Sequence, residues 1–156
     1  MNIFKFLATA AVTASTLFVP SSASASLNAG EVQLADALNN AGVEVYVGEC
    51  PDDKFYGLYS PEHNAIAICT NVAETEEQRW ETLRHEAIHA AQKCVNPSMA
   101  FTVKSSQYLM SNGLQSDWDF IQKAYDRKDW AIELEAFTLM RSSNSEVADV
   151  VNNACN

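Results

Sequence analysis

One stretch of the chain, Thr75 to Cys94, constrains the fold more than any other, because its pattern predicts a single long amphipathic helix. Thr75 with Gln78 three residues later is typical of a capping box, which begins a helix. Asn96-Pro97 follows as a stop signal. Apolar residues recur at roughly helical spacing between these ends: Trp80, Leu83, Ala87, Ala90 and Ala91.

This helix carries the motif His85-Glu86-x-x-His89. Two histidines four residues apart lie on the same helical face, so both imidazoles can reach one cation at about 2.0–2.1 Å. Glu86 follows the first histidine directly, which places its carboxylate beside the cation rather than on it. There it can take a proton from a metal-bound water molecule.

Residues 1–25 are expected to be a secretory signal peptide. A basic start at Lys5 precedes an apolar run, and Ala23-Ser24-Ala25 is typical of a cleavage site. The apolar run is shorter than the roughly 20 residues that cross a bilayer. We therefore expect a single domain over residues 26–156, exported to the periplasm or the medium and without stable membrane association.

The charge of this domain excludes two classes of partner. The chain has 10 basic and 20 acidic residues, and Lys5 is the one charged residue within the signal peptide. The mature net charge is thus 9 minus 20, or −11. Such an acidic protein is a poor binder of nucleic acids or anionic membranes. The sequence leaves the oligomeric state open.

Four cysteines in an exported protein predict two disulfides, with three possible connectivities. Cys69 and Cys94 flank the long helix, whose ends are roughly 27 Å apart at 1.5 Å per residue. That separation far exceeds the reach of a disulfide. We therefore favour Cys50–Cys69 and Cys94–Cys155. A four-cysteine zinc site is the rival interpretation, although the chain lacks a C-x-x-C pair.

The order of the predicted elements indicates an α+β fold. We expect a small, mostly antiparallel three-stranded sheet packed on helices, followed by a helical C-terminal half. The predicted helices cover residues 28–41, 75–94, 99–110, 116–125, 130–141 and 143–155, and the predicted strands cover residues 43–47, 55–60 and 65–69.

A catalytic zinc site needs a third protein ligand and an open position for water. His63 is expected in an exposed turn, so the candidates are Glu133 and Glu135 on the helix that starts at Trp130. At about 100° per residue from Trp130, Glu133 falls near 300°, within the apolar arc, whereas Glu135 falls near 140° among polar residues.

We therefore favour Glu133 as the ligand, because a buried carboxylate is costly unless it is paired or binds metal. Glu135 is expected to be solvated or to form a salt bridge. Asp126, Asp129 or the absence of a third ligand are the remaining alternatives, and either aspartate is also a candidate to orient a histidine.

The pair of motifs resembles the gluzincin branch of the zincin metallopeptidases. The match consists of His85-Glu86-x-x-His89 and of Glu133-Leu-Glu-Ala136, which looks like the E-x-x-A third-ligand helix of such families. The metzincin extension after the second histidine is absent. The chain is also very short for a peptidase, which implies shallow substrate pockets. The resemblance implies a minimal zincin-like fold in which the strand over residues 65–69 is the sheet edge that lines the substrate cleft.

The expected activity is hydrolysis of peptide bonds in a peptide or protein substrate. One zinc ion held by His85, His89 and Glu133 would activate water, and Glu86 would be the general base. Many zincins add a tyrosine or histidine donor to the oxyanion. Tyr125 is our first candidate for that role, and Tyr108 is the second.

Two rival functions stay open. One is a zinc hydrolase acting on a non-protein amide, because peptide deformylase also carries H-E-x-x-H and uses a cysteine ligand upstream, where Cys50 stands here. The other is a secreted binding or structural protein whose motif is degenerate or holds a structural ion. Sensitivity of an activity to a chelator separates the enzymes from the non-enzyme.

Overall fold

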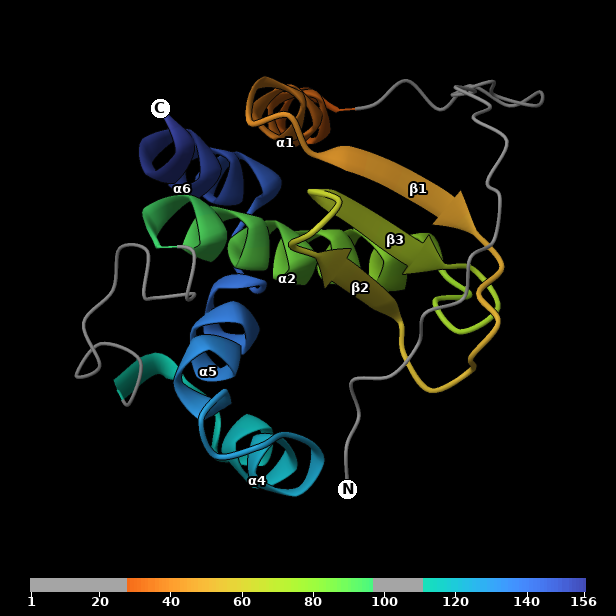
Figure 1. Cartoon of the computed structure of the whole chain (residues 1–156), viewed down its shortest axis with the longest axis vertical. Helices are drawn as coiled ribbons and strands as arrows, with labels where there is room; N and C mark the ends of the chain where they lie inside the picture. The colour runs from red at the N-terminus through yellow and green to blue at the C-terminus, as the bar shows by residue number, and fades with distance from the viewer. Residues whose placement is uncertain (1–27, 97–110) are drawn as a thin grey trace.

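The computed structural model of the chain describes residues 28–96 and 111–156. The expected signal peptide (residues 1–25), the expected helix from Met99 to Met110, and Tyr108 lie outside the described residues. The described elements, labelled as in Figure 1, are α1 (Ala29–Asn40), β1 (Glu44–Gly48), β2 (Gly57–Ser60), β3 (Ala65–Cys69), α2 (Glu76–Val95), α4 (Gln115–Ala124), α5 (Trp130–Leu139) and α6 (Asn144–Cys155).

The α+β class, the three-stranded sheet and the helical C-terminal half are confirmed. The strand order is β1-β3-β2, and the sheet is mixed rather than mostly antiparallel. β3 pairs with β1 in parallel and with β2 in antiparallel orientation. Successive strands along the chain run in opposite directions, so β1 and β3 run in the same direction. Because the order β1-β3-β2 makes these two strands neighbours, they pair in parallel.

The expectation that β3 is an edge strand is wrong, because β3 lies in the centre of the sheet. Its run of apolar residues reflects that position: Ile66 and Ile68 are almost completely buried. The two edges are β1 and β2, and β2 is the edge that contacts α2.

The capping box expected at Thr75 and Gln78 forms, because capping depends on residues close in sequence. Two other helices also begin with reciprocal capping boxes, in which the pairs are Asn28 with Glu31 and Ser143 with Glu146. For α2 this fixes the first turn, and the motif histidines follow on the same helix.

Helix α2 runs through the middle of the molecule (Figure 1). It packs against β2 and β3 of the sheet, and also against α5 and α6. Its fully buried residues, among them Ala87 and Ile88, belong to the main hydrophobic core. Gly57 allows β2 to approach, because a Cβ there would lie 2.5 Å from Cγ2 of Thr82 on α2.

Both favoured disulfides are confirmed. Cys50–Cys69 joins the loop after β1 to the end of β3, and Cys94–Cys155 joins the last turns of α2 and α6. Two disulfides indicate that the protein resides in an oxidising environment such as the cell exterior. Among the residues that the structure describes, no helix combines the length and the apolar character that a membrane crossing requires.

Candidate metal centre

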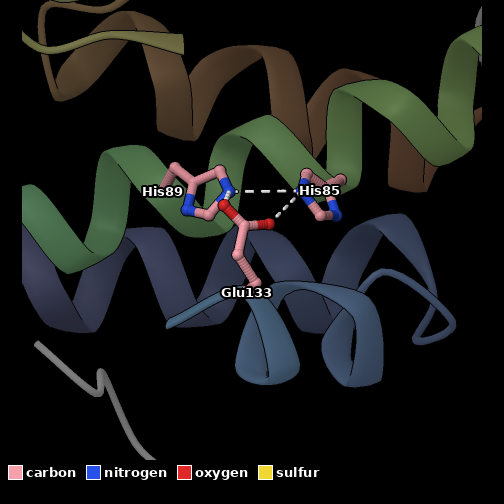
Figure 2. A group of neighbouring side chains, drawn as sticks. All are labelled: His85, His89 and Glu133. Carbon is pink, nitrogen blue, oxygen red and sulfur yellow. Dashed lines mark hydrogen bonds and ion pairs between the residues drawn. The ribbon is translucent and has the colours of Figure 1, made fainter. Parts of the chain in front are cut away.

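The two motif histidines lie one turn apart on the face of α2 that looks toward α5 (Figure 2). Both are buried, at 9% and 8% exposure for His85 and His89. Their Nε2 atoms face each other at 3.2 Å. The ring of Phe137 from α5 meets His85 edge to face, with centroids 4.7 Å apart. The His85 ring therefore packs against a side chain of the same helix that carries Glu133.

Glu133 reaches the same point from α5 (Figure 2). Its Oε2 lies 3.4 Å from Nε2 of His85, and its Oε1 lies 3.6 Å from Nε2 of His89. Oε2 is buried, and no described group donates a hydrogen bond to it. Burying a carboxylate oxygen without a hydrogen-bond donor costs free energy. A bound cation would provide the partner that the described residues do not provide.

The three residues fit a metal ion. Their ligand atoms all lie within 4.8 Å of one another. Two ligands that each lie about 2.1 Å from an ion in tetrahedral geometry are about 3.4 Å apart. The 3.2 Å between the two Nε2 atoms is close to that edge, and each histidine lies 3.4 or 3.6 Å from a different oxygen of Glu133. His85, His89 and Glu133 could therefore hold a metal ion after a small shift of the Glu133 carboxylate, because three protein ligands leave a fourth tetrahedral position for water or substrate.

The charges around His85, His89 and Glu133 also favour the binding of a cation. Burial alone would lower the pKa of His89, but contact with Glu133, the charges of Glu86 and Glu133 and a hydrogen bond with Gln92 raise it to about 9. Burial alone would raise the pKa of Glu133, but contact with both histidines and their positive charge lower it to about 2. The site thus concentrates negative charge around two nitrogen donors.

Glu86 and Tyr125, both expected in the site from the sequence, lie at its margin. Glu86 is 7% exposed, and its charge acts on both His89 and Tyr125. Burial raises the pKa of Tyr125, and so do the charges of Glu133 and Glu86 and a side-chain hydrogen bond with Glu133. The phenol of Tyr125 therefore stays protonated and is available as a donor beside the candidate ligands.

Of the two expectations for Glu135, solvation is wrong, because its side chain is completely buried, whereas the alternative of a salt bridge is not tested. Oε2 of Glu135 accepts a hydrogen bond of 2.9 Å from Nε2 of Gln92. Oε1 of Gln92 in turn lies 2.8 Å from Nδ1 of His89. Glu133 and Glu135 both meet residues of α2, so the face that α5 buries is wider than the apolar arc that the sequence predicts.

Sequence reasoning missed Gln92. Nδ1 of His89 faces this glutamine rather than the expected Asp126 or Asp129. The signal was present, since a glutamine three residues after a histidine lies on the same helical face. His63 is exposed, as expected for a turn residue, and it is not part of the metal group.

The disulfides overturn two of the sequence-based alternatives. All four cysteines are paired, so a four-cysteine zinc site is wrong. Cys50 is bonded to Cys69 and cannot be the thiolate ligand that a deformylase-like site requires. Among the described residues, the group made by His85, His89 and Glu133 remains the candidate.

Comparison with known proteins gives one family. A family model described as a domain of unknown function, DUF8637, matches residues 24–156. No curated protein and no solved structure matches the chain.

Proposed function

The chain belongs to the DUF8637 family, and we propose that this protein is an exported zinc-dependent metallopeptidase of the gluzincin type. The observation that carries the proposal is the convergence of Nε2 of His85, Nε2 of His89 and the Glu133 carboxylate, whose ligand atoms lie within 4.8 Å of one another in a buried place. Two histidines and a glutamate are the ligand set of several zinc peptidases, and it leaves a position open.

A bound zinc ion supplies Lewis acidity, which activates water and polarises a carbonyl group. Glu86 accepts the proton of the attacking water and delivers it to the leaving amine. The phenol of Tyr125 donates a hydrogen bond to the oxygen of the attacked carbonyl as negative charge develops there. Burial of Glu86 at 7% exposure keeps competing water away from the proton that it carries.

The substrate strand pairs with β2 rather than with β3. β3 is flanked on both sides and has no free edge, whereas β2 has one free edge and packs on the motif helix. An extended peptide can add to such an edge through its main chain, which gives affinity with little side-chain preference. The close approach of Gly57 to Thr82 holds that edge against α2.

Export is part of the proposal, and it does not identify a substrate. The two disulfides fit a signal peptide in residues 1–25, because both belong to proteins that leave the cytoplasm. We place the mature protein in the periplasm or the medium.

Cleavage of a mixture of fluorogenic peptides by the purified protein tests this function. We expect cleavage that 1,10-phenanthroline abolishes and that added zinc restores. The matched variants are Glu86→Gln and Glu81→Gln, because both remove one charge from α2 but Glu81 is exposed. Cleavage should be lost in the first variant and retained in the second. A protein that binds zinc tightly but cleaves nothing would contradict the proposal and indicate a structural ion.

A further inference from the structure

Gln92 links the two helices that carry the candidate ligands. It follows His89 by one turn of α2 and is completely buried. Its Oε1 lies 2.8 Å from Nδ1 of His89. Its Nε2 lies 2.9 Å from Oε2 of Glu135 and 3.0 Å from the carbonyl oxygen of Ile132, and both of these residues are on α5. One amide group thus touches a histidine on one helix and two acceptors on the other.

The orientation of this amide follows from its partners. The carbonyl of Ile132 can only accept a hydrogen bond, so the NH₂ group of Gln92 must face α5 and its oxygen must face His89. An amide oxygen accepts and never donates, so Nδ1 of His89 must carry the hydrogen. In the neutral ring, the lone pair is then on Nε2. This is the nitrogen that lies 3.2 Å from Nε2 of His85.

We propose that Gln92 is the positioning residue of the metal centre. It selects the tautomer and the ring orientation in which His89 binds metal through Nε2. Through Ile132 and Glu135, it also holds α5 in the register that brings Glu133 to the histidines. This inference depends on the metal site of the proposed function but not on peptide cleavage.

The chemistry of the position requires an amide. Metal-binding histidines usually donate their second N–H to a carboxylate, a carbonyl or water. A glutamate at position 92 could accept from His89, but it could not donate to Ile132 or to Glu135. It would also bring two carboxylates into contact in a fully buried place, which is costly. Gln92 meets both needs because it accepts on one side and donates on the other.

Zinc affinity, measured by competition with a chromophoric chelator, is the first test. Gln92→Met keeps the approximate volume of the side chain but removes its polar atoms. We expect it to weaken zinc binding about 10- to 100-fold, as is typical when the partner of a metal-binding histidine is lost. The control is Gln122→Met, since Gln122 is an exposed residue of α4. Wild-type affinity in Gln92→Met would overturn the proposal.

A double variant that exchanges the side chains of Gln92 and Glu135 separates a positioning role of Gln92 from simple packing. Gln92→Glu alone should weaken zinc binding, because it puts two carboxylates together. Combining it with Glu135→Gln separates the two carboxylates and restores one donor and one acceptor with their places reversed, while the carboxylate at position 92 still accepts from His89. We expect the double variant to recover most of the zinc affinity that Gln92→Glu loses. Failure to recover it while the protein remains folded would overturn the proposal.

A spectroscopic measurement on the wild-type protein needs no variant. With ¹⁵N-labelled histidine and bound cadmium-113, coupling to the ring nitrogens reports which one binds the ion. We expect coupling to Nε2 of His89 and a slowly exchanging proton on its Nδ1. Coupling to Nδ1 of His89 would overturn the proposal. A protein with these signals that cleaves no peptide would instead refute the proposed function and leave the role of Gln92 intact.

Discussion

Oε2 of Glu133 lies 3.4 Å from Nε2 of His85, although one residue is on α5 and the other is on α2. Both side chains are buried, and the carboxylate oxygen has no hydrogen-bond donor among the described residues. In the metal-free protein, burial alone would raise the pKa of Glu133, but contact with the two histidines already lowers it to about 2, so the contact is favourable when a histidine carries a proton. A metal cation at the same point would supply the positive charge in place of that proton, and the three residues could hold such an ion.

Replacing the proposed general base should separate metal binding from chemistry. Glu86→Gln keeps the shape of the side chain but removes its capacity to accept a proton. We expect zinc binding to stay within a few-fold of wild type and kcat/KM to fall by about 10²- to 10⁴-fold, which is the usual contribution of a general base. Peptide hydrolysis and zinc affinity, measured on the same preparation, test this. Unchanged hydrolysis would exclude Glu86 from the mechanism.

Tyr125→Phe should impair the transition state more than substrate binding. The phenol hydroxyl interacts with Glu133 and lies within the electrostatic reach of Glu86. Loss of one oxyanion donor typically lowers kcat about 10²- to 10³-fold. We expect this drop with little change in KM or in thermal stability. Steady-state kinetics on one peptide measure both constants, and a rise in KM at constant kcat would contradict the role.

Zinc affinity should increase with pH. In the metal-free protein, burial favours the neutral His89 ring, but contact with Glu133, the charges of Glu86 and Glu133 and the hydrogen bond with Gln92 together raise its pKa to about 9. Below that pH, a proton occupies the ring and must leave when zinc binds. The apparent affinity should therefore fall by up to about tenfold for each pH unit below 9. Chelator competition at several pH values measures it, and an affinity that does not change with pH would contradict the account.

The two disulfides should contribute unequally to stability. Cys94–Cys155 closes a separation of 61 residues, whereas Cys50–Cys69 closes one of 19. Chain entropy then predicts losses of about 4 and about 3 kcal/mol when each pair is replaced by alanines. Urea unfolding of the two double variants measures this difference. A larger loss for the Cys50–Cys69 pair would show that strain or unfolded-state structure dominates instead.

The sequence predicts those parts of the fold that depend on neighbouring residues. The start of α2 follows from Thr75 and Gln78, and β3 has the predicted bounds because its apolar run is short and bounded by turns. The central place of β3 was not predictable, because strand order depends on contacts between distant segments. Helical geometry indicated Glu133, since its position on the helix follows from residue spacing alone.

Residue spacing alone does not predict the hydrogen-bond partner of His89. Gln92 lies on the right face of α2, but its role depends on Ile132 and Glu135, which α5 brings into contact only in the folded protein. Glu135 itself was misassigned because the face that α5 buries against α2 is wider than the apolar arc, and Gln92 of α2 supplies a donor to the carboxylate at its flank.

Zinc content after dialysis, measured by mass spectrometry on wild type, Glu133→Ala and the exposed control Glu81→Ala, tests the central claim most directly. The account predicts one zinc ion per chain in wild type and in the control. It predicts loss of zinc from Glu133→Ala, because removing a ligand should exceed the 10- to 100-fold effect of losing a ligand's partner. Full zinc content in Glu133→Ala, or a wild-type protein that binds no zinc, would contradict the account.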